Sequence, residues 1–312
     1  MEVPFFSARA VRAAVPPELA YEAVRAGFIA YARGEWTMQP KLYVTNYPAG
    51  DFRAMPALGG GHALLKWVTS FPGNPARGLP TVTGVVVLCD AETGQVVALL
   101  DAAAVTALRT GAAAVLAADA LGRRGSDHAA VVGAGVNGLA AVQTFVAVGR
   151  RVMLWDVDDA RAAAGAASVG AEVAASLEEA LAADLVVTVT PGREILLPEG
   201  SLRPGQHVSL MGADGPGKAE IAAAELARTR VFCDDWEQAS HGGELTAAVT
   251  AGLLTRNDVG MLGDVLAGTA PGRTSDDEIT AFDSTGLAIQ DLAIARAALE
   301  RAGELDVPLL EL

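Results

Sequence analysis

Cysteine, histidine and basic side chains are all scarce in this sequence, and each scarcity narrows what the protein does. Cys89 and Cys233 are its two cysteines, and both lie in apolar runs, so we expect buried structural thiols rather than a disulfide or a metal ligand. The four histidines lack the spacing of a metal site, and no metal is expected. This pattern is typical of a reducing, cytoplasmic setting.

Positive charge is also in short supply. Lys and Arg number 23 against 37 Asp and Glu, and the net charge of −14 comes without any basic block, which argues against nucleic-acid partners and anionic membrane surfaces. No apolar run reaches the roughly 18 residues of a membrane span, and the first residues, which carry the acid Glu2 and no basic region, argue against a signal peptide. A chain of 312 residues, 51% of them hydrophobic, instead predicts a well-buried globular protein of about two domains.

The stretch that organises the chain is rich in glycine. Four small or branched apolar residues, 129–132, predict a buried strand, and Gly133, Gly135 and Gly138 then form a G-x-G-x-x-G pattern before Ala-rich helical sequence. Gly133 permits a tight turn, Gly135 lets a pyrophosphate approach the backbone, and Gly138 lets helix and strand pack closely. The N-terminus of the helix would face the phosphates. The pattern predicts a dinucleotide site; the alternative is a glycine-rich turn without a ligand.

A second apolar run supports the dinucleotide interpretation. It ends in Asp156, and 156 − 133 = 23 residues separate this acid from the first glycine, which is where an acid binds a ribose hydroxyl. A carboxylate there also predicts NAD(H) over NADP(H), because a 2′-phosphate would meet like charge. Asp158 and Asp159 add negative potential, and Arg161 is the nearby base, one turn into the next helix.

The two halves of the chain differ in the order of their predicted strands and helices. From about residue 125, strand and helix alternate, which is typical of a doubly wound parallel sheet. The earlier half predicts a helix from Pro16 to about Arg33, several antiparallel-looking strands and a long helix over residues 101–121 broken only by Gly111. We therefore expect an α/β protein in which a Rossmann-type sheet accompanies an α+β substrate domain. The predicted strand runs of the second half lie near Val131, Val152, Val173, Val187, Val208 and Val231.

A few polar residues stand where chemistry is expected. Lys66 interrupts an apolar strand and either faces a cleft or lies on the wet face of that strand. Arg109, among small apolar residues of a helix, either binds a carboxylate or is an ordinary surface arginine. Asp214 follows a parallel strand, at the edge where ligands bind, or is an acid in a loop. Asp234 and Asp235 are better explained as a solvated face or a helix N-cap than as a polar site.

These residues also carry a resemblance. The chain resembles the ornithine cyclodeaminase/mu-crystallin family, which includes alanine dehydrogenases of archaeal type and cyclic-imine (ketimine) reductases. The resemblance spans about residues 40 to 300 in the family's order. The matching stretches are Lys66 with residues 71–75, and residues 78–84, 107–113, 133–136, 212–218, 234–238 and 276–286.

The resemblance implies roles for individual residues. Lys66 and Arg109 would bind the substrate, Asp214 would donate and accept the proton beside the reacting carbon, and Thr285 would lie near the substrate. Lys66 and Asp214 would be the catalytic pair. The implied cofactor contacts are Thr81, Arg109, Gly133, Gly135, Val136, Asn137, Gly138, Asp156, Thr190, Met211, Gly212, Lys218 and Ser284. The substrate and dimerisation domain would comprise residues 1–118 with the C-terminal helix, about 290–312, and the Rossmann domain residues 119–289, in a homodimer.

Two departures from the family pattern bear on the activity. Lys41 stands where family members usually carry an arginine that grips the substrate carboxylate, which keeps the charge but loses the bidentate fork. The segment 234–244 resembles the dehydrogenase and reductase branch rather than the true cyclodeaminases. The expected function is an NAD(P)-dependent amino or imino acid oxidoreductase, either an alanine dehydrogenase or a reductase of cyclic imines such as pyrroline-2-carboxylate.

Two alternatives stay open at this point. In an ornithine or lysine cyclodeaminase the same hydride leaves and returns, and ammonia is lost without net redox change. A protein of another class would bind the cofactor without turnover, as the mu-crystallin scaffold does. Loss of Lys66 or Asp214 would favour that second alternative, and both residues are present.

Overall fold

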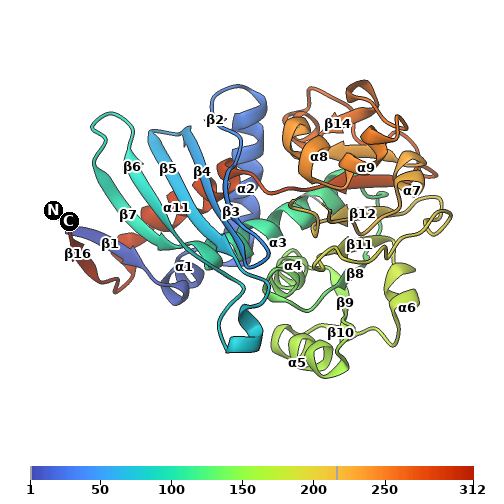
Figure 1. Ribbon diagram of the computed structural model, residues 1–312, viewed down its shortest axis with the longest axis horizontal. Coiled ribbons are helices and arrows are strands. Elements are labelled where there is room, and N and C mark those ends of the chain that lie inside the picture. The colour runs from blue at the N-terminus through green and yellow to red at the C-terminus, as the bar shows by residue number, and fades with distance from the viewer. Residues whose placement is uncertain (1, 216) are drawn as a thin grey trace. The chain divides into compact units, whose positions relative to one another are not determined.

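The computed structural model describes residues 2–215 and 217–312; Met1, and Pro216 in the predicted 212–218 motif, lie outside the described residues. The chain forms two compact units. The first unit comprises Met1–Arg109 and Leu287–Leu312, and the second comprises Thr110–Gly286 (Figure 1). The division falls within a single helix, α3 (Ala102–Leu121), whereas the sequence suggested a boundary near residue 118.

The first unit is built on one sheet with the strand order β16-β1-β7-β6-β5-β4-β2, in which β3 also pairs with β4. Strand β1 runs parallel to β7 and the other pairs are antiparallel. The strands are β1 (Glu2–Phe6), β2 (Thr37–Met38), β3 (Leu42–Asn46), β4 (Gly50–Gly59), β5 (His62–Ser70), β6 (Val82–Asp90), β7 (Val96–Asp101) and β16 (Leu309–Glu311). The helices are α1 (Ala8–Ala14), α2 (Pro17–Ala32) and α11 (Ala288–Glu300), with short 3-10 turns η1 (Asn74–Arg77) and η3 (Ala302–Glu304).

The two faces of this sheet differ in how exposed their side chains are. The closing helix α11 packs on β4, on β5 and on α2, and it lies along the sheet in Figure 1. Helices α2 and α11 approach closely because Gly27 has no side chain: a Cβ there would lie 3.3 Å from the Cβ of Ala293. The period-2 alternation of β5 then buries Leu64 and Val68 under the helix and exposes Leu65 and Trp67 on the opposite face.

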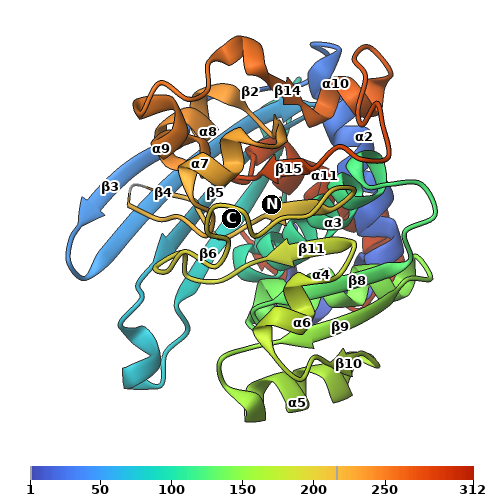
Figure 2. The ribbon, with the colours of Figure 1, turned by 90° about the vertical axis from the view of Figure 1, so that its right-hand side faces the viewer.

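The second unit is a doubly wound parallel sheet with the strand order β10-β9-β8-β11-β12-β15-β13-β14, so the predicted α/β fold class is confirmed. Strands and helices alternate along the chain, as the green to yellow segments of Figure 2 show. The strands are β8 (His128–Val132), β9 (Arg151–Trp155), β10 (Glu172–Val173), β11 (Leu185–Thr188), β12 (His207–Leu210), β13 (Arg230–Cys233), β14 (Val259–Met261) and β15 (Thr280–Asp283). The helices are α4 (Val136–Ala147), α5 (Asp159–Val169), α6 (Leu177–Leu181), α7 (Ala223–Ala227), α8 (Trp236–Gly242), α9 (Leu245–Thr250) and α10 (Leu262–Ala267), with η2 (Arg256–Asp258).

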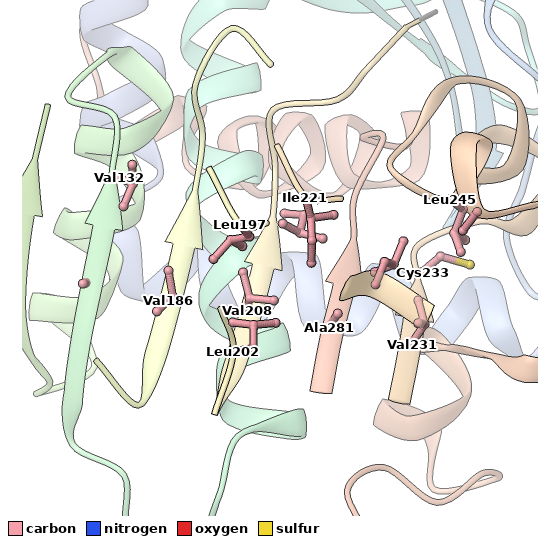
Figure 3. Packing of buried hydrophobic residues seen from close by; sticks show 14 of the residues in the cluster. Val132, Val186, Leu197, Leu202, Val208, Ile221, Val231, Cys233, Leu245 and Ala281 are labelled. Carbon is pink, nitrogen blue, oxygen red and sulfur yellow. The ribbon is translucent and has the colours of Figure 1, made fainter. Parts of the chain in front are cut away.

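A row of apolar side chains crosses this sheet and forms much of its core. Parallel register places Val186, Val208, Ala281 and Val231 side by side on neighbouring strands. Figure 3 shows these side chains with Leu197, Ile221 and Leu245 packed among them, all of them almost completely buried. The core strand β15 was not among the strand runs that the sequence predicted, because its four residues carry a polar group at each end.

Helix α3 is continuous through Gly111, so the predicted break is absent. Gly111 serves close packing instead, because a Cβ there would lie 2.5 Å from the backbone of Ala140 in α4. Among the described residues, α3 is also the one helix that is long and apolar enough to cross a membrane by length and composition. Since 83% of its apolar stretch is buried within the protein, α3 is better described as a core helix.

Candidate active site

The residues predicted to carry chemistry fall into one group in each unit. In the first unit, Lys66 lies on the face of β5 that α11 covers and is 1% exposed, so the interpretation of a wet-face lysine is wrong. Its Nζ lies 2.7 Å from each carboxylate oxygen of Asp291 in α11 and 3.2 Å from the hydroxyl of Thr106. A buried ammonium is tolerated because it is paired and hydrogen-bonded.

Burial changes the proton affinity of this lysine. Desolvation lowers the pKa of Lys66 from 10.5 to about 7, Asp291 opposes that shift, and the positive charges of Arg109 and Lys41 reinforce it. Lys66 therefore exchanges its proton near neutral pH, which makes it able both to hold an anion and to take part in proton transfer.

Arg109 is largely covered by other residues rather than on the open surface. Its side chain is 11% exposed, its Nε lies 3.5 Å from Oδ1 of Asp291, and its Nη1 donates a 3.4 Å hydrogen bond to Oε1 of Gln290. Asp291 thus sits between two cations, and the trio carries a net charge of +1 when Lys66 is protonated. A substrate carboxylate is the kind of ligand that would neutralise that excess.

The structure adds a cation that the sequence analysis missed. Arg53 of β4 is 9% exposed and pairs with Asp51, Nε to Oδ1, at 2.6 Å; it also lies over the ring of Tyr43. Register pairs Met55 with Lys66, so Arg53 is two residues along on the same face of the sheet. The alternation of β4, in which Asp51, Arg53 and Met55 are all buried, was the available signal.

The group is positive overall. Arg53, Lys66 and Arg109 face Asp51 and Asp291, which gives 3 − 2 = +1 when Lys66 is protonated, in a chain whose net charge is −14. Asp291 itself lies on a part of the closing helix that is buried in the structure, next to Gln290. Such a concentration of buried positive charge in an acidic protein favours an anionic ligand.

In the second unit, the glycine-rich turn has the geometry that its pattern predicts. Gly133 has a φ of 114°, and a Cβ on Gly138 would lie 1.8 Å from the carbonyl oxygen of Gly133, so both positions need glycine. Gly135 is the N-cap of α4, and a Cβ there would meet open space, which leaves room for a phosphate to approach the backbone. Next to it, Val136 is exposed and Asn137 is half-buried, and the residues present fit a dinucleotide.

Asp156 ties this turn to the neighbouring strand. Its Oδ2 accepts a 2.8 Å hydrogen bond from the backbone N–H of Ala134, and its Oδ1 accepts one of 2.9 Å from that of Asp158. Each carboxylate oxygen keeps a second lone pair, which is what ribose hydroxyls require. Arg161 is nearer than the sequence suggested, with Nη1 3.7 Å from Asp156 and Nη2 3.3 Å from Asp158.

Asp214 stands in the loop after β12, and its carboxylate accepts a 2.5 Å hydrogen bond from Lys218. Both side chains are about one-third exposed, at 33% and 34%, so they are accessible to a ligand. The predicted cofactor residues Thr190, Met211 and Gly212 lie at the ends of β11 and β12, with Met211 and Gly212 buried and Thr190 half-buried.

Asp234 is not part of a solvated face. It is 1% exposed, and its carboxylate accepts hydrogen bonds from Ser284 at 3.1 Å, Thr285 at 3.2 Å and the N–H of Gly286 at 2.8 Å. Asp235, in contrast, is the N-cap of α8, as expected. Asp234 therefore holds the two hydroxyl residues that were predicted to contact cofactor and substrate.

The remaining predictions concern Thr81, the cysteines and metals. Thr81, just before β6 in the first unit, is half-buried, and its cofactor role stays a prediction. Cys233 is buried and Cys89 only half-buried, and both are free thiols. In residues 2–215 and 217–312, no group of three or more His, Cys, Asp or Glu side chains is arranged to hold a metal ion.

Comparison with known proteins places these observations in a family. The family model described as "Ornithine cyclodeaminase/mu-crystallin family" matches residues 5–305. The chain is 41% identical over 311 residues to an alanine dehydrogenase of Archaeoglobus fulgidus, covering 97% of this chain and 96% of the relative. A solved archaeal alanine dehydrogenase dimer with bound NAD superposes with a TM-score of 0.93 at 38% identity, covering 100% and 99% of the two chains.

A second solved structure is similar over the whole chain. The iminosuccinate reductase of Paracoccus denitrificans, in complex with NAD+, has a TM-score of 0.91 at 30% identity and full coverage of both chains at 100%. Both likenesses extend over the whole chain and agree with the predicted dinucleotide site. The chain therefore belongs to the ornithine cyclodeaminase/mu-crystallin family.

Proposed function

We propose that this protein is a nicotinamide-dependent oxidoreductase that moves a hydride between the nicotinamide and the α-carbon of a small amino or imino acid. The observation that carries the proposal is the buried positive group around Lys66 in a strongly acidic chain that also has a dinucleotide-binding turn. The names of the relatives, alanine dehydrogenase and iminosuccinate reductase, support the same reaction class.

The roles of the residues follow from their chemistry. Arg109 and Arg53 bind and orient the substrate carboxylate, and Lys66 adds a third donor whose charge depends on pH. Asp214 exchanges the proton at the reacting nitrogen or carbon, a task for which its partly exposed carboxylate is accessible. The bound nicotinamide supplies the hydride acceptor or donor. Asp234 keeps Ser284 and Thr285 in place.

NAD(H) is the preferred cofactor in this proposal. Asp156 offers two carboxylate oxygens to the ribose hydroxyls, and Asp158 adds negative charge that repels a 2′-phosphate. Arg161 is the residue that would weaken this preference, but its guanidinium is already paired with both acids.

We further propose a homodimer formed by the exposed apolar side chains on one face of the first unit's sheet. Leu65 and Trp67 of β5 are 42% and 38% exposed, and Leu42 and Val44 of β3 are 59% and 50% exposed. Alternation and register place all four on the face opposite Lys66. Monomers rarely expose contiguous apolar patches of this kind, and an alanine dehydrogenase of closely similar structure is a dimer. The substitution Trp67→Glu should shift the mass in solution from dimer to monomer.

The test of the activity is an assay of the purified protein with NADH and NADPH against 2-oxo acids plus ammonia, cyclic imines and ornithine. Oxidation of NADH with a 2-oxo acid and ammonia, or with a cyclic imine, is the expected result. Consumption of ornithine with release of ammonia and no net change in NADH absorbance would make the protein a cyclodeaminase instead. Binding of NADH without turnover of any substrate would make it a binding protein.

The free thiols also favour a cytoplasmic location.

A further inference from the structure

Glu220 is a buried carboxylate that none of the roles above uses. Its side chain is 0% exposed, and it lies in the segment of the chain that connects β12 to β13 in the second unit. Burial raises the pKa of Glu220, while hydrogen bonds from Thr190 and Thr188 oppose that shift. A buried acid is costly unless its oxygens are satisfied, so its partners indicate what it does.

Its carboxylate accepts hydrogen bonds from four donor groups, which belong to three residues at the ends of two neighbouring strands. Oε1 accepts from the backbone N–H of Thr190 at 2.8 Å and from the Thr190 hydroxyl at 2.6 Å. Oε2 accepts from the Thr188 hydroxyl at 2.7 Å and from the N–H of Gly212 at 3.0 Å. Strands β11 and β12 pair in parallel, with Thr188 opposite Leu210. One carboxylate therefore ties together the C-terminal ends of both strands, which is the edge where such sheets bind ligands.

Glycine at position 212 fits this arrangement. A Cβ at Gly212 would lie 2.5 to 2.7 Å from the carboxyl atoms of Glu220, so a side chain there would displace the carboxylate. The backbone of Glu220 is fixed as well. Its N–H donates to both oxygens of Glu244, at 2.8 and 3.0 Å, and its carbonyl accepts from Leu196 at 2.7 Å and Leu197 at 3.0 Å.

The hydrogen bond to Glu220 fixes the orientation of the Thr190 hydroxyl. Its hydrogen is committed to Glu220, and its oxygen accepts one hydrogen bond, of 3.2 Å, from the N–H of Gly192. A hydroxyl has one donor and two acceptor sites, so the capacity that is left is an acceptor. Thr190 is half-buried and can meet a ligand that brings a donor, such as a ribose hydroxyl or a carboxamide N–H.

We propose that Glu220 is a positioning residue of the cofactor site, which fixes the ends of β11 and β12 and holds the Thr190 hydroxyl as an acceptor for a donor group of the dinucleotide. This inference rests on the proposed function, because it needs a nicotinamide cofactor to bind. Glu220, although out of contact with solvent, would then set how tightly the cofactor is bound.

The variant Glu220→Gln tests it. An amide offers one oxygen and one NH2 group, so at least one strand-end donor meets another donor, and the Thr190 hydroxyl is free to turn. The Kd of NADH, measured by fluorescence titration of the purified full-length protein, should rise at least tenfold, about 1.4 kcal/mol.

The chain offers a matched control in Glu225. It is 0% exposed, and it accepts hydrogen bonds of 2.7 Å from the backbone N–H groups of Gly200 and Leu202. Glu225→Gln should lower the melting temperature by an amount comparable to Glu220→Gln while changing the Kd of NADH less than about twofold, since an unpaired buried donor costs stability wherever it lies.

Two further variants keep the inference testable if Glu220→Gln does not fold. Thr188 is 0% exposed and cannot touch a cofactor, yet Thr188→Val removes one donor to Glu220 and should weaken NADH binding severalfold. In a double-mutant cycle, Glu220→Gln should add little to Thr190→Val, because both act through the same hydroxyl.

The outcomes separate this inference from the proposed function. If wild-type protein binds NADH and neither Glu220→Gln nor Thr188→Val weakens binding beyond the Glu225→Gln control, Glu220 has no positioning role and the proposed function stands. Additive effects in the cycle would equally overturn the link to Thr190. If wild-type protein does not bind NADH, the proposed function and this inference both fail.

Discussion

Replacing Asp291 by Asn should convert Lys66 from a titrating residue into a permanently neutral one. Asn keeps the shape of the side chain but removes the charge that lies 2.7 Å from Nζ. At an effective dielectric constant of about 20, that attraction amounts to roughly 4–6 kcal/mol. This corresponds to about 3–4 pKa units at roughly 1.4 kcal/mol each. Since Lys66 already has a pKa of about 7, its pKa in the variant falls far below neutral pH.

The effect should appear in the pH profile of kcat/KM for a carboxylate substrate, which reports on the free enzyme. In wild-type protein, Lys66 is charged below pH 7 and loses its proton above it, so its contribution to substrate binding fades as pH rises through about 7. In Asp291→Asn the step should vanish. Loss of a charge-assisted hydrogen bond costs roughly 1.5–3 kcal/mol, so kcat/KM at low pH should fall about 10- to 100-fold.

Two controls frame this experiment. Lys66→Arg keeps a positive charge at every pH, so the fall in kcat/KM near pH 7 should also disappear. In this variant kcat/KM should stay high above neutral pH, whereas in Asp291→Asn it should be low at every pH. Asp306→Asn removes an exposed acid of the same unit and should leave the profile unchanged. A wild-type profile in Asp291→Asn would refute the assignment of a titrating, carboxylate-binding Lys66.

Four further predictions follow from the same geometry. Because the pKa of Lys66 is lower in the folded protein than in the unfolded chain, unfolding takes up a proton between about pH 7 and 10.5, and stability rises with pH across that window; urea denaturation should show a smaller rise in Lys66→Met. Asp214→Asn should lower kcat by roughly 10²–10⁴-fold while NADH still binds, and an activity above about a tenth of wild type would remove Asp214 from the proton transfer. Asp156→Ser should narrow the preference for NADH over NADPH, mainly by weakening NADH, and equal use of both cofactors by wild-type protein would contradict the proposed preference. Gly138→Ala would place a Cβ 1.8 Å from the oxygen of Gly133, so it should cost about 1–3 kcal/mol of stability and impair NADH binding, as thermal unfolding with and without NADH would show.

The local features of this protein were readable from its sequence because they rest on local rules. The glycine spacing of residues 133–138 dictates a turn that other residues cannot form, and alternating strand and helix patterns dictate a parallel sheet. The acid after β9 and the acid after β12 were placed correctly at strand ends for the same reason. A long apolar helix over residues 102–121 needed no tertiary information, whereas the tolerance of Gly111 within it depended on the close approach of α4.

What the sequence left open was decided by contacts between distant segments. Period-2 alternation gives two faces to β5 but does not say which one is covered, and only the return of α11 put Lys66 inside. The partner that makes this burial tolerable, Asp291, lies 225 residues away along the chain. Glu220 likewise acquires its hydrogen-bond partners only when the fold brings the ends of β11 and β12 together around it. A buried charge depends on the partners that the fold supplies, so residue type and spacing predict the candidate residues, and the tertiary structure decides their burial and their hydrogen-bond partners.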